Sequence, residues 1–284
     1  MNNVAITLNF IKKLGLEHDF YNLPYDLKIA TITLTCKLDT AINVQNIGHY
    51  MNLNKNDVVC VKYGPDKIIR SLIQLKKNYN SAGKKKKNFQ NQVSLMIKIK
   101  NDRNIHVKLF SNGTMQITGC KTVCNFVEMM RILCRKLLEV KFTYNLITKQ
   151  TVKKTFISEP DNIKVEKISD LKIRMINSNF HVGFMIDRVI LYKLLLEKGY
   201  ECNYDQCSHA AVNLKYKCDN DEISIFIFES GSIIITGVKN KIHINESYNF
   251  IVTFLHDNYN IIAKHDIDKF LQRPDIKKLI ADDL

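Results

Sequence analysis

Apolar and polar residues alternate along two segments of the chain, a pattern typical of strands with one buried face. The segment VKLFSNGTMQITGCK (107–121) carries two interleaved sets on opposite faces: Val107, Leu109, Met115 and Ile117, and Lys108, Phe110, Gln116 and Thr118. In IFIFESGSIIITGVK (225–239) both sets are apolar: Ile225, Ile227, Ile233 and Ile235, and Phe226, Phe228 and Ile234. Ser-Asn-Gly and Glu-Ser-Gly interrupt the alternation and predict a hairpin turn in each segment.

A helical pattern follows each predicted hairpin. Residues 121–140 and 241–262 place apolar side chains three or four positions apart, as expected of amphipathic helices that pack on a core. Shorter helical patterns occur near residues 39–51 and 184–198. Each half of the chain therefore reads as strand, short helix, several strands and long helix. This order predicts an α+β fold.

The two halves also share sequence. Asp-Leu-Lys-Ile begins at Asp26 and again at Asp170, and the two hairpin glycines are Gly113 and Gly231. The first motif recurs after 144 residues and the second after 118, so the first half holds 26 additional residues between its motifs. Solenoid repeats have periods of about 20–50 residues. The longer spacing here indicates duplication of a domain-sized unit.

The duplication predicts the domain organisation. The additional residues of the first half include KKNYNSAGKKKKNFQNQ (76–92), whose Lys, Asn, Gly and Ser content is typical of a solvated loop. We expect an N-terminal extension (1–24), a first repeat (25–155) with a Lys-rich insertion at about 64–90, a linker (156–170), a second repeat (171–264) and a C-terminal tail (265–284).

The charge of the chain indicates an acidic partner. The formal net charge is +14, although the hydrophobic fraction of 45% and the charged fraction of 25% are ordinary for a globular protein. Nucleic acid and anionic membrane are the leading candidates for such a partner. The sequence has neither an apolar run of about 18 residues nor the layout of a signal peptide. We therefore expect an intracellular protein without a membrane span.

The cysteines and histidines do not form a recognised catalytic or metal-binding motif. Eight cysteines occur without a C-x-x-C pair, which favours reduced, mostly buried thiols. The alternative is an irregular metal site formed by Cys202, Cys207, His209 and Cys218. The chain also lacks a P-loop, a G-x-S-x-G and an H-E-x-x-H motif. We expect no cofactor and no small-molecule substrate, and an enzyme ranks last among the candidate functions.

Three blocks resemble the core of the TATA-box-binding protein (TBP) family. They are IATITLTCKLD (29–39), the LF-x-x-G…ITG-x-K run of the first half and its IF-x-x-G…ITG-x-K counterpart. The Lys-, Ile- and Asn-rich composition is more similar to homologues from large DNA viruses than to cellular ones. The resemblance covers roughly residues 25–264. It implies a pseudo-two-fold saddle, in which a curved antiparallel sheet carries its helices on the convex side.

The family resemblance also implies a DNA-binding face. In this family the concave side of the sheet lies in the minor groove, which is read by apolar contact, shape and ease of bending. Phe110 and Phe228 stand where the family has wedge phenylalanines, and Thr118 and Thr236 where threonines contact the central base edges. Carried over by position, the contact residues are Leu27, Ile29, Thr31, Lys108, Phe110, Gln116, Thr118, Leu171, Ile173, Met175, Phe226, Phe228, Ile234 and Thr236.

The chain departs from the family pattern at several of these positions. Leu27 and Leu171 replace the paired asparagines that bond to base edges. The second wedge phenylalanine is not evident in either half: its place falls nearest Gln92 or Val93 in the first, with Phe89 slightly upstream in the insertion, and near His209 in the second. These losses put a strict TATA preference in doubt. Phosphate attraction, which supplies much of the affinity of such proteins, is unaffected by them.

Two functions follow from the resemblance. The first is a general transcription initiation factor that binds AT-rich promoter DNA and recruits a B-type initiation factor and RNA polymerase. The second is a protein-interaction scaffold that has lost autonomous DNA binding.

Residues 84–87 (Lys84, Lys85, Lys86 and Lys87) are either a solvated loop or an arm that contacts flanking phosphates. Both candidate functions, initiation factor and scaffold, place the protein in the nucleus or, for a virus, at a cytoplasmic replication site.

Overall fold

The computed structural model describes residues 23–74, 89–100 and 103–264. The chain divides into two compact units. Unit 1 contains Ile29–Ile176, and unit 2 contains Leu23–Lys28 and Asn177–Leu284, as far as these residues are described. No helix among the described residues is long and apolar enough to span a bilayer.

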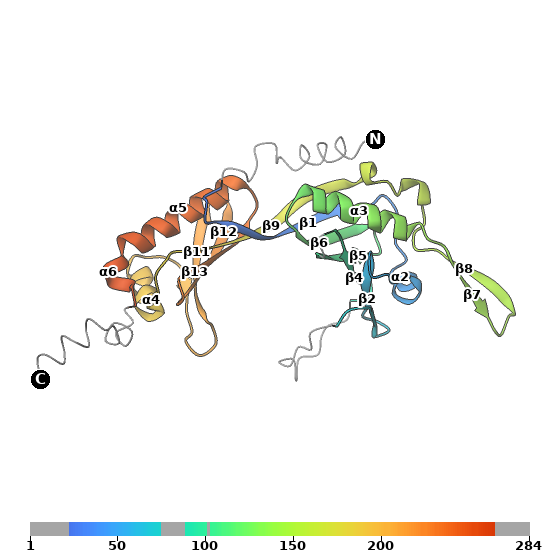
Figure 1. Cartoon of the computed structure of the whole chain (residues 1–284), viewed down its shortest axis with the longest axis horizontal. Helices are drawn as coiled ribbons and strands as arrows, with labels where there is room; N and C mark the ends of the chain where they lie inside the picture. Colours follow the sequence, from blue (N-terminus) through green and yellow to red (C-terminus); the bar gives the residue numbers. More distant parts are fainter. Residues whose placement is uncertain (1–22, 75–88, 101–102, 265–284) are drawn as a thin grey trace, which may run out of the picture. The chain divides into compact units, whose positions relative to one another are not determined.

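Unit 1 is an antiparallel sheet with helices packed against it (Figure 1). Its strands follow one another across the sheet in the order β1–β6–β5–β4–β2–β3. The elements of the sheet and its helices are β1 (Lys28–Lys37), α2 (Val44–Tyr50), β2 (Val58–Tyr63), β3 (Ile68–Ser71), β4 (Gln92–Lys98), β5 (Asn104–Phe110), β6 (Thr114–Cys120) and α3 (Val123–Leu137). A separate hairpin, β7 (Lys141–Asn145) and β8 (Gln150–Lys154), and two short 3-10 helices, η2 (Pro160–Asn162) and η3 (Val165–Lys167), follow α3.

Unit 2 repeats this order of elements with fewer residues. Its main segment begins within β9 (Ser169–His181), which belongs to unit 1 up to Ile176. The strand order of its sheet is β10–β11–β12–β13–β9. The remaining elements are α4 (Arg188–Glu197), β10 (Cys202–Asn203), β11 (Ala211–Cys218), β12 (Asp221–Phe228), β13 (Ser232–Val238), α5 (Lys241–Asp257) and α6 (Tyr259–Ile262). The predicted α+β class with antiparallel strands is confirmed.

The alternation of side chains builds the core of each unit. In unit 1 the alternate residues Leu95, Val107, Leu109 and Ile117 are at most 2% exposed, on the face of the sheet that α3 covers. In unit 2 the equivalent positions on β12 and β13 are four fully buried isoleucines beneath α5: Ile225, Ile227, Ile233 and Ile235. Burial of a side chain of this size contributes about 1.5–3 kcal/mol. One face of the sheet in each unit is therefore buried against the long helix of that unit.

The two long helices begin with equivalent caps. The Thr122 hydroxyl accepts a hydrogen bond from Asn125 N in α3, and the Asn240 side chain accepts one from His243 N in α5. Such caps satisfy backbone donors that a helix start leaves unpaired. The helix predicted over 241–262 is in fact two helices, since α5 ends at Asp257 and α6 is a separate turn.

The hairpin glycines adopt a backbone conformation that other residues rarely adopt. Gly113 has a φ of +86° and Gly231 a φ of +83°. A Cβ atom on Gly113 would lie 2.3 Å from Leu38 O, and one on Gly231 would lie 2.1 Å from Phe184 O. Both the positive φ and the close backbone therefore require glycine. This explains why both copies of the repeat have glycine at this point.

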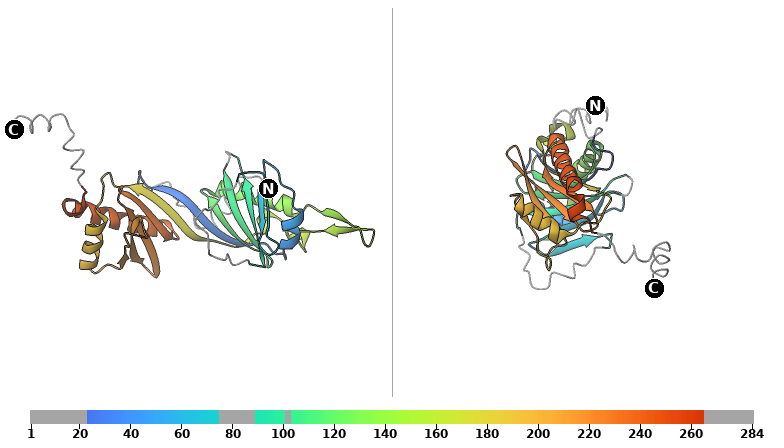
Figure 2. Two further views of the ribbon diagram at one scale, coloured as in Figure 1. Left: turned by 90° about the horizontal axis from the view of Figure 1, so that it is seen from below. Right: turned by 90° about the vertical axis from the view of Figure 1, so that its left-hand side faces the viewer.

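Three features of the fold differ from the sequence prediction. The insertion expected at 64–90 is not only a loop, because it contains β3, which pairs with the preceding strand β2. The β7–β8 hairpin was not predicted; it extends away from the sheet of unit 1 (Figure 2) and exposes Phe142, Tyr144, Leu146 and Ile147. The expected linker at 156–170 does not separate the units, since the division falls within β9.

The segment expected to be a linker is part of unit 1 because its apolar side chains are buried there. Phe156 is fully buried, and Ile163 and Ile168 are at most 4% exposed. Asn43 N donates a 2.8 Å hydrogen bond to Phe156 O, at the start of α2. The acidic and proline-containing composition that indicated a linker is confined to the surface side of this segment, at residues such as Glu159 and Asp161.

Candidate nucleic-acid interface

The face of the unit 1 sheet opposite α3 is polar and basic. Cross-strand pairs on β4, β5 and β6 place the exposed His106 and Lys108 next to partly exposed side chains: Met96 with His106, Ser94 with Lys108, and Lys108 with Gln116. Thr118 faces His106 on one side and Thr33 on the other. A shallow depression on this face is lined by Lys62, Ser94, Met96, His106 and Lys108, among others. We call these five residues the basic depression.

One histidine of the basic depression favours its neutral form. Burial, followed by the charge of Lys62, lowers the pKa of His106. An anion placed beside these side chains would stabilise the protonated imidazole and reverse the shift. The basic depression is therefore suited to a partner with negative charge.

Two further strands of unit 1 expose uncharged side chains from the predicted contact set. On β1, Ile29 and Thr31 are partly exposed, and on β9 so are Leu171, Ile173 and Met175. The next residue of the same alternation, Asn177, belongs to unit 2. These side chains point to the same side of their strands by the period of two. The sequence prediction therefore identified exposed residues on both strands.

Leu27 is a correction to the predicted contact set. It precedes β1, belongs to unit 2 and is only 6% exposed. Leu27 N donates a hydrogen bond to Pro24 O, so the residue closes a turn. Its side chain packs in the core instead of facing solvent, and a ligand could reach it only if this turn opened.

The open face of unit 2 is more apolar than that of unit 1. A shallow depression is lined by His209, Ala211, Asn213, Phe226 and Phe228, among others. We call these five residues the aromatic depression. Phe226 faces Ile234 across the strand pair, and both are partly exposed, while the neighbouring isoleucines are fully buried. Two partly exposed phenylalanines on one face are an uncommon surface feature, typical of a binding site.

Strand register fixes the neighbours of the two wedge-position phenylalanines. Phe110 lies opposite Gln92, and Phe228 lies opposite Ala211. Val93, the other candidate in unit 1, is fully buried on the opposite face. The position expected near His209 is therefore Ala211. Each unit presents one phenylalanine here next to a residue that is not aromatic.

Two asparagines on the open face of unit 2 escaped the sequence prediction. The Thr236 hydroxyl donates a 2.6 Å hydrogen bond to Asn177 Oδ1, a bond that does not use the amide N–H groups of Asn177. Asn213 lies opposite Phe226, and its Oδ1 has no hydrogen-bond partner among the described residues. Amide N–H groups can donate to the acceptors of the minor groove. Only strand register reveals these residues, since neither belongs to the repeated motif.

The predictions for the lysine-rich segment and for the cysteines remain to be compared with the structure. Residues 84–87 lie outside the described residues. Five of the eight cysteines are buried, as predicted: Cys36, Cys60, Cys120, Cys134 and Cys218. Burial raises the pKa of the Cys120 and Cys134 thiols to about 12, so both are protonated at neutral pH. Thiols in this state are poor nucleophiles and suit a core position.

Comparisons with known proteins bear on the family. A family model described as transcription factor TFIID (or TATA-binding protein, TBP) matches residues 170–258. A protein of Acanthamoeba polyphaga mimivirus named TATA-box-binding protein-like is 38% identical over 272 residues, which cover 89% of this chain and 71% of that protein. Among solved structures, Methanococcus jannaschii TBP covers 82% of this chain with 99% of its own, at 14% identity and a TM-score of 0.49. The chain belongs to the TATA-box-binding protein family, as a divergent member similar to a viral one.

Proposed function

We propose that this TBP-like transcription protein is an initiation factor that binds promoter DNA in the minor groove through the open faces of its sheets. The observation that carries the proposal is the aromatic depression of unit 2. Phe226 and Phe228 are partly exposed there, beside Ile234 and away from the helices. Family membership also favours a role without catalysis.

The aromatic depression suits the minor groove for a physical reason. The groove is narrow, and at A·T pairs its floor shows only acceptors. Apolar side chains there can enter between base steps and kink the duplex, at a cost of a few kcal/mol per step that new contacts offset. Phe228 is the wedge candidate of unit 2, and the amides of Asn177 and Asn213 supply donors to the base edges.

The basic depression contributes in a different way. Lys62 and Lys108 lie beside His106 and would attract phosphates, which adds affinity without sequence information. Protonation of His106 on binding would add a further positive charge. We therefore expect unit 1 to supply salt-dependent affinity and unit 2 to supply the apolar and shape-dependent contacts. Recruitment of a B-type initiation factor and RNA polymerase is the second part of the proposal and rests on family membership alone.

The test is fluorescence anisotropy of the full chain on AT-rich and GC-rich duplexes at several salt concentrations. We expect an AT preference that persists at physiological salt. Phe228→Ala should weaken binding to the AT-rich duplex about 5- to 150-fold, since stacking of one base on an aromatic ring is worth about 1–3 kcal/mol. Phe142→Ala is the matched control, because Phe142 is an exposed phenylalanine on the β7–β8 hairpin.

The alternative function is a protein-interaction scaffold with no autonomous DNA specificity. It is supported by the burial of Leu27 and by Leu171, which stand where the family has asparagines. Weak binding that does not distinguish the two duplexes and disappears with salt would favour the scaffold. An equal effect of Phe228→Ala and Phe142→Ala would likewise argue against a groove-binding aromatic depression.

A further inference from the structure

The turn between β11 and β12 meets the start of α5 at a cluster of potential metal ligands. Cys218 ends β11, Asp219 lies in the turn, and His243 lies in the first turn of α5. One ligand atom from each of these three residues lies within 4.8 Å of the other two. The cluster is on the helix side of unit 2, since Cys218 shares the alternation of the buried Val212 and Leu214.

His243 is a buried histidine, and only one of its two ring nitrogens has a hydrogen-bond partner among the described residues. The residue is 4% exposed. Its Nε2 lies 3.3 Å from Asp219 Oδ2, while Nδ1 makes no hydrogen bond within the described parts of the chain. The nearest group to Nδ1 is Asp221 Oδ2, at 3.8 Å. Buried polar atoms normally have partners, so the orientation of this ring needs an explanation.

Cys218 also contacts a carboxylate next to the cluster. Its Sγ atom lies 2.7 Å from Glu246 Oε2, although the thiol is only 3% exposed. Glu246 and His243 are three residues apart on α5, so they project from the same side of the helix. Asp221 is engaged elsewhere, because Lys239 Nζ lies 2.5 Å from its Oδ1. One sulfur, one imidazole nitrogen and one carboxylate therefore lie together, and a second carboxylate, that of Glu246, contacts the sulfur.

We propose that Cys218, Asp219, His243 and Glu246 bind a zinc ion. Thiolate and imidazole are ligands for zinc, whereas Mg²⁺ and Ca²⁺ prefer oxygen atoms throughout. Tetrahedral zinc holds its ligand atoms about 3.4 Å apart. The distance of 3.3 Å between His243 Nε2 and Asp219 Oδ2 is close to that value, and the distance of 2.7 Å between Cys218 Sγ and Glu246 Oε2 is shorter, so side-chain rotations that move Glu246 away from Cys218 would complete the geometry.

The surrounding residues match the usual outer shell of a zinc site. A zinc-bound histidine donates its second N–H to a carboxylate, which fixes the ring. With the metal on Nε2, the Nδ1–H of His243 would point toward Asp221, which Lys239 holds in place. The ion would join the β11–β12 turn to α5. Its role is therefore structural, and it stabilises unit 2 from the side away from the aromatic depression.

The test uses the full chain, stripped with a chelator and titrated with Zn²⁺ and with Co²⁺. We expect one equivalent of zinc per chain, a rise in melting temperature, and a sulfur-to-cobalt charge-transfer band with Co²⁺. Cys218→Ser should abolish the band. Asp219→Asn should weaken zinc binding about 10-fold or more. The Asp219 side chain is 78% exposed, so this variant keeps the fold even if Cys218→Ser does not.

Cys207→Ser and His256→Gln are the matched controls, since both residues are exposed in the same unit and neither lines the aromatic depression. They should bind zinc like the unmodified chain. The proposal would be overturned by a wild-type chain that takes up no zinc, by a cobalt complex without the sulfur band, or by loss of binding in either control. Unchanged binding in Asp219→Asn would also contradict the ligand set. None of these results affects the proposed DNA contacts, which lie on the opposite face.

Discussion

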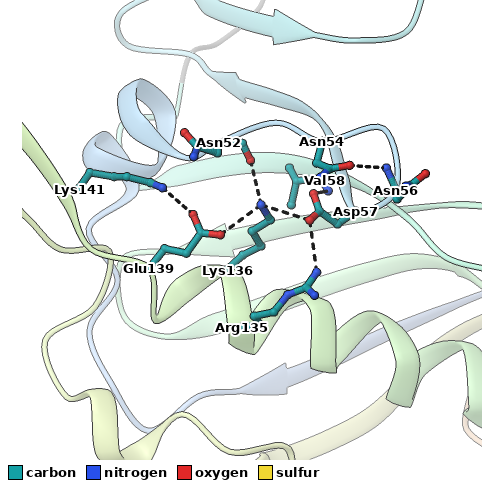
Figure 3. A network of polar contacts seen from close by, with 9 residues as sticks. All are labelled: Asn52, Asn54, Asn56, Asp57, Val58, Arg135, Lys136, Glu139 and Lys141. Carbon is teal, nitrogen blue, oxygen red and sulfur yellow. Dashed lines mark hydrogen bonds and ion pairs between the residues drawn. The ribbon is translucent and has the colours of Figure 1, made fainter.

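Lys136 Nζ lies 3.2 Å from Asp57 Oδ2, and both side chains are buried in unit 1 (Figure 3). Lys136 Nζ also lies 3.2 Å from Glu139 Oε1 and donates to Asn52 O at 3.4 Å. Asp57 Oδ1 accepts a 2.5 Å hydrogen bond from Val58 N. The network links α3 to the segment before β2, which keeps the helix in register with the sheet it covers.

We expect Lys136→Met to destabilise the protein by about 3 kcal/mol. Removing one member of a buried ion pair leaves the other charge without compensation in a low-dielectric site. Arg135→Met should cost less than about 1 kcal/mol, because the Arg135 side chain is 65% exposed although it also contacts Asp57. Urea unfolding of the two variants measures the difference. Equal losses would contradict the assignment of Lys136 as the buried partner.

The hairpin glycine of unit 2 gives a second stability prediction. Gly231→Ala should cost about 1–3 kcal/mol, since alanine must adopt a positive φ and its Cβ would meet Phe184 O. Gly183→Ala is the control: its φ is +88°, but no atom lies within 4 Å of the added Cβ. Thermal unfolding should therefore show the larger shift for Gly231→Ala. A shift of the same size in both variants would mean that the backbone contact is easily relieved.

The angle by which the protein bends DNA should distinguish the role of the aromatic depression from that of the basic depression. We expect Phe228→Ala to reduce the bend angle more than Lys108→Ala, because a wedge between base steps produces the kink whereas a lysine neutralises phosphate. Energy transfer between dyes at the two ends of a duplex measures the angle. If both variants bend DNA to the same extent, Phe228 does not act as a wedge. Lys108→Ala should instead reduce the salt dependence of binding.

The lysine-rich segment can be tested in the same assay. Deleting residues 80–88, which contain Lys84–Lys87 and lie outside the described residues, removes four positive charges. An arm that contacts flanking phosphates would lose affinity for all duplexes about equally, and the salt slope would become flatter. A solvated loop predicts no change in the slope. Anisotropy titrations at several salt concentrations distinguish the two cases.

Stability at high pH should depend on Tyr248. Its hydroxyl donates a 2.7 Å hydrogen bond to Asp26 Oδ1 within unit 2. Burial, followed by Asp26, raises the pKa of Tyr248 from 10.0 to about 12. The unfolded chain therefore loses this proton first, and stability falls as the pH rises from 10 toward 12.

Tyr248→Phe removes the group that titrates. The variant should lose about 1 kcal/mol at neutral pH, because the hydrogen bond is gone, but should show a smaller loss above pH 10 than the unmodified chain. Urea midpoints below and above pH 10 provide the comparison. Parallel losses in both proteins would show that Tyr248 does not contribute to the pH dependence.

Much of the fold could be predicted because its signals are local. The period of two along β5 and β6 distinguishes a core face from an open face, and the structure has the buried residues where the alternation predicts them. Along β12 and β13 the alternation separates two apolar sets, and only the packing of α5 decides which set is buried. Gly113 and Gly231 mark turns because only glycine tolerates the backbone found there. The alternation and the hairpin glycines depend only on residues close together in the sequence, and each occurs in both halves of the duplication.

Leu27 and the segment at 156–170 show where local signals fail. Both were interpreted from composition or alignment, yet both are set by what they pack against: Leu27 and Phe156 are buried because other segments cover them. The alternation along β1 continues to Leu27 in the sequence, so it cannot show that Leu27 lies before the strand, in a turn. Likewise, no local pattern shows that the exposed β7–β8 hairpin pairs only with itself among the described strands.

The sequence by itself determined the duplication, the faces of the strands, the long helices and the resemblance to the TBP family, since each depends on neighbouring residues or on spacing. Only the tertiary structure decided that Asn177 bonds to Thr236, that Phe228 lies opposite Ala211, and that Cys218 meets His243. These pairs are 17 to 59 residues apart, a separation that only strand register and helix packing close. Local periodicity fixes which way a side chain points, whereas its partner depends on the whole fold.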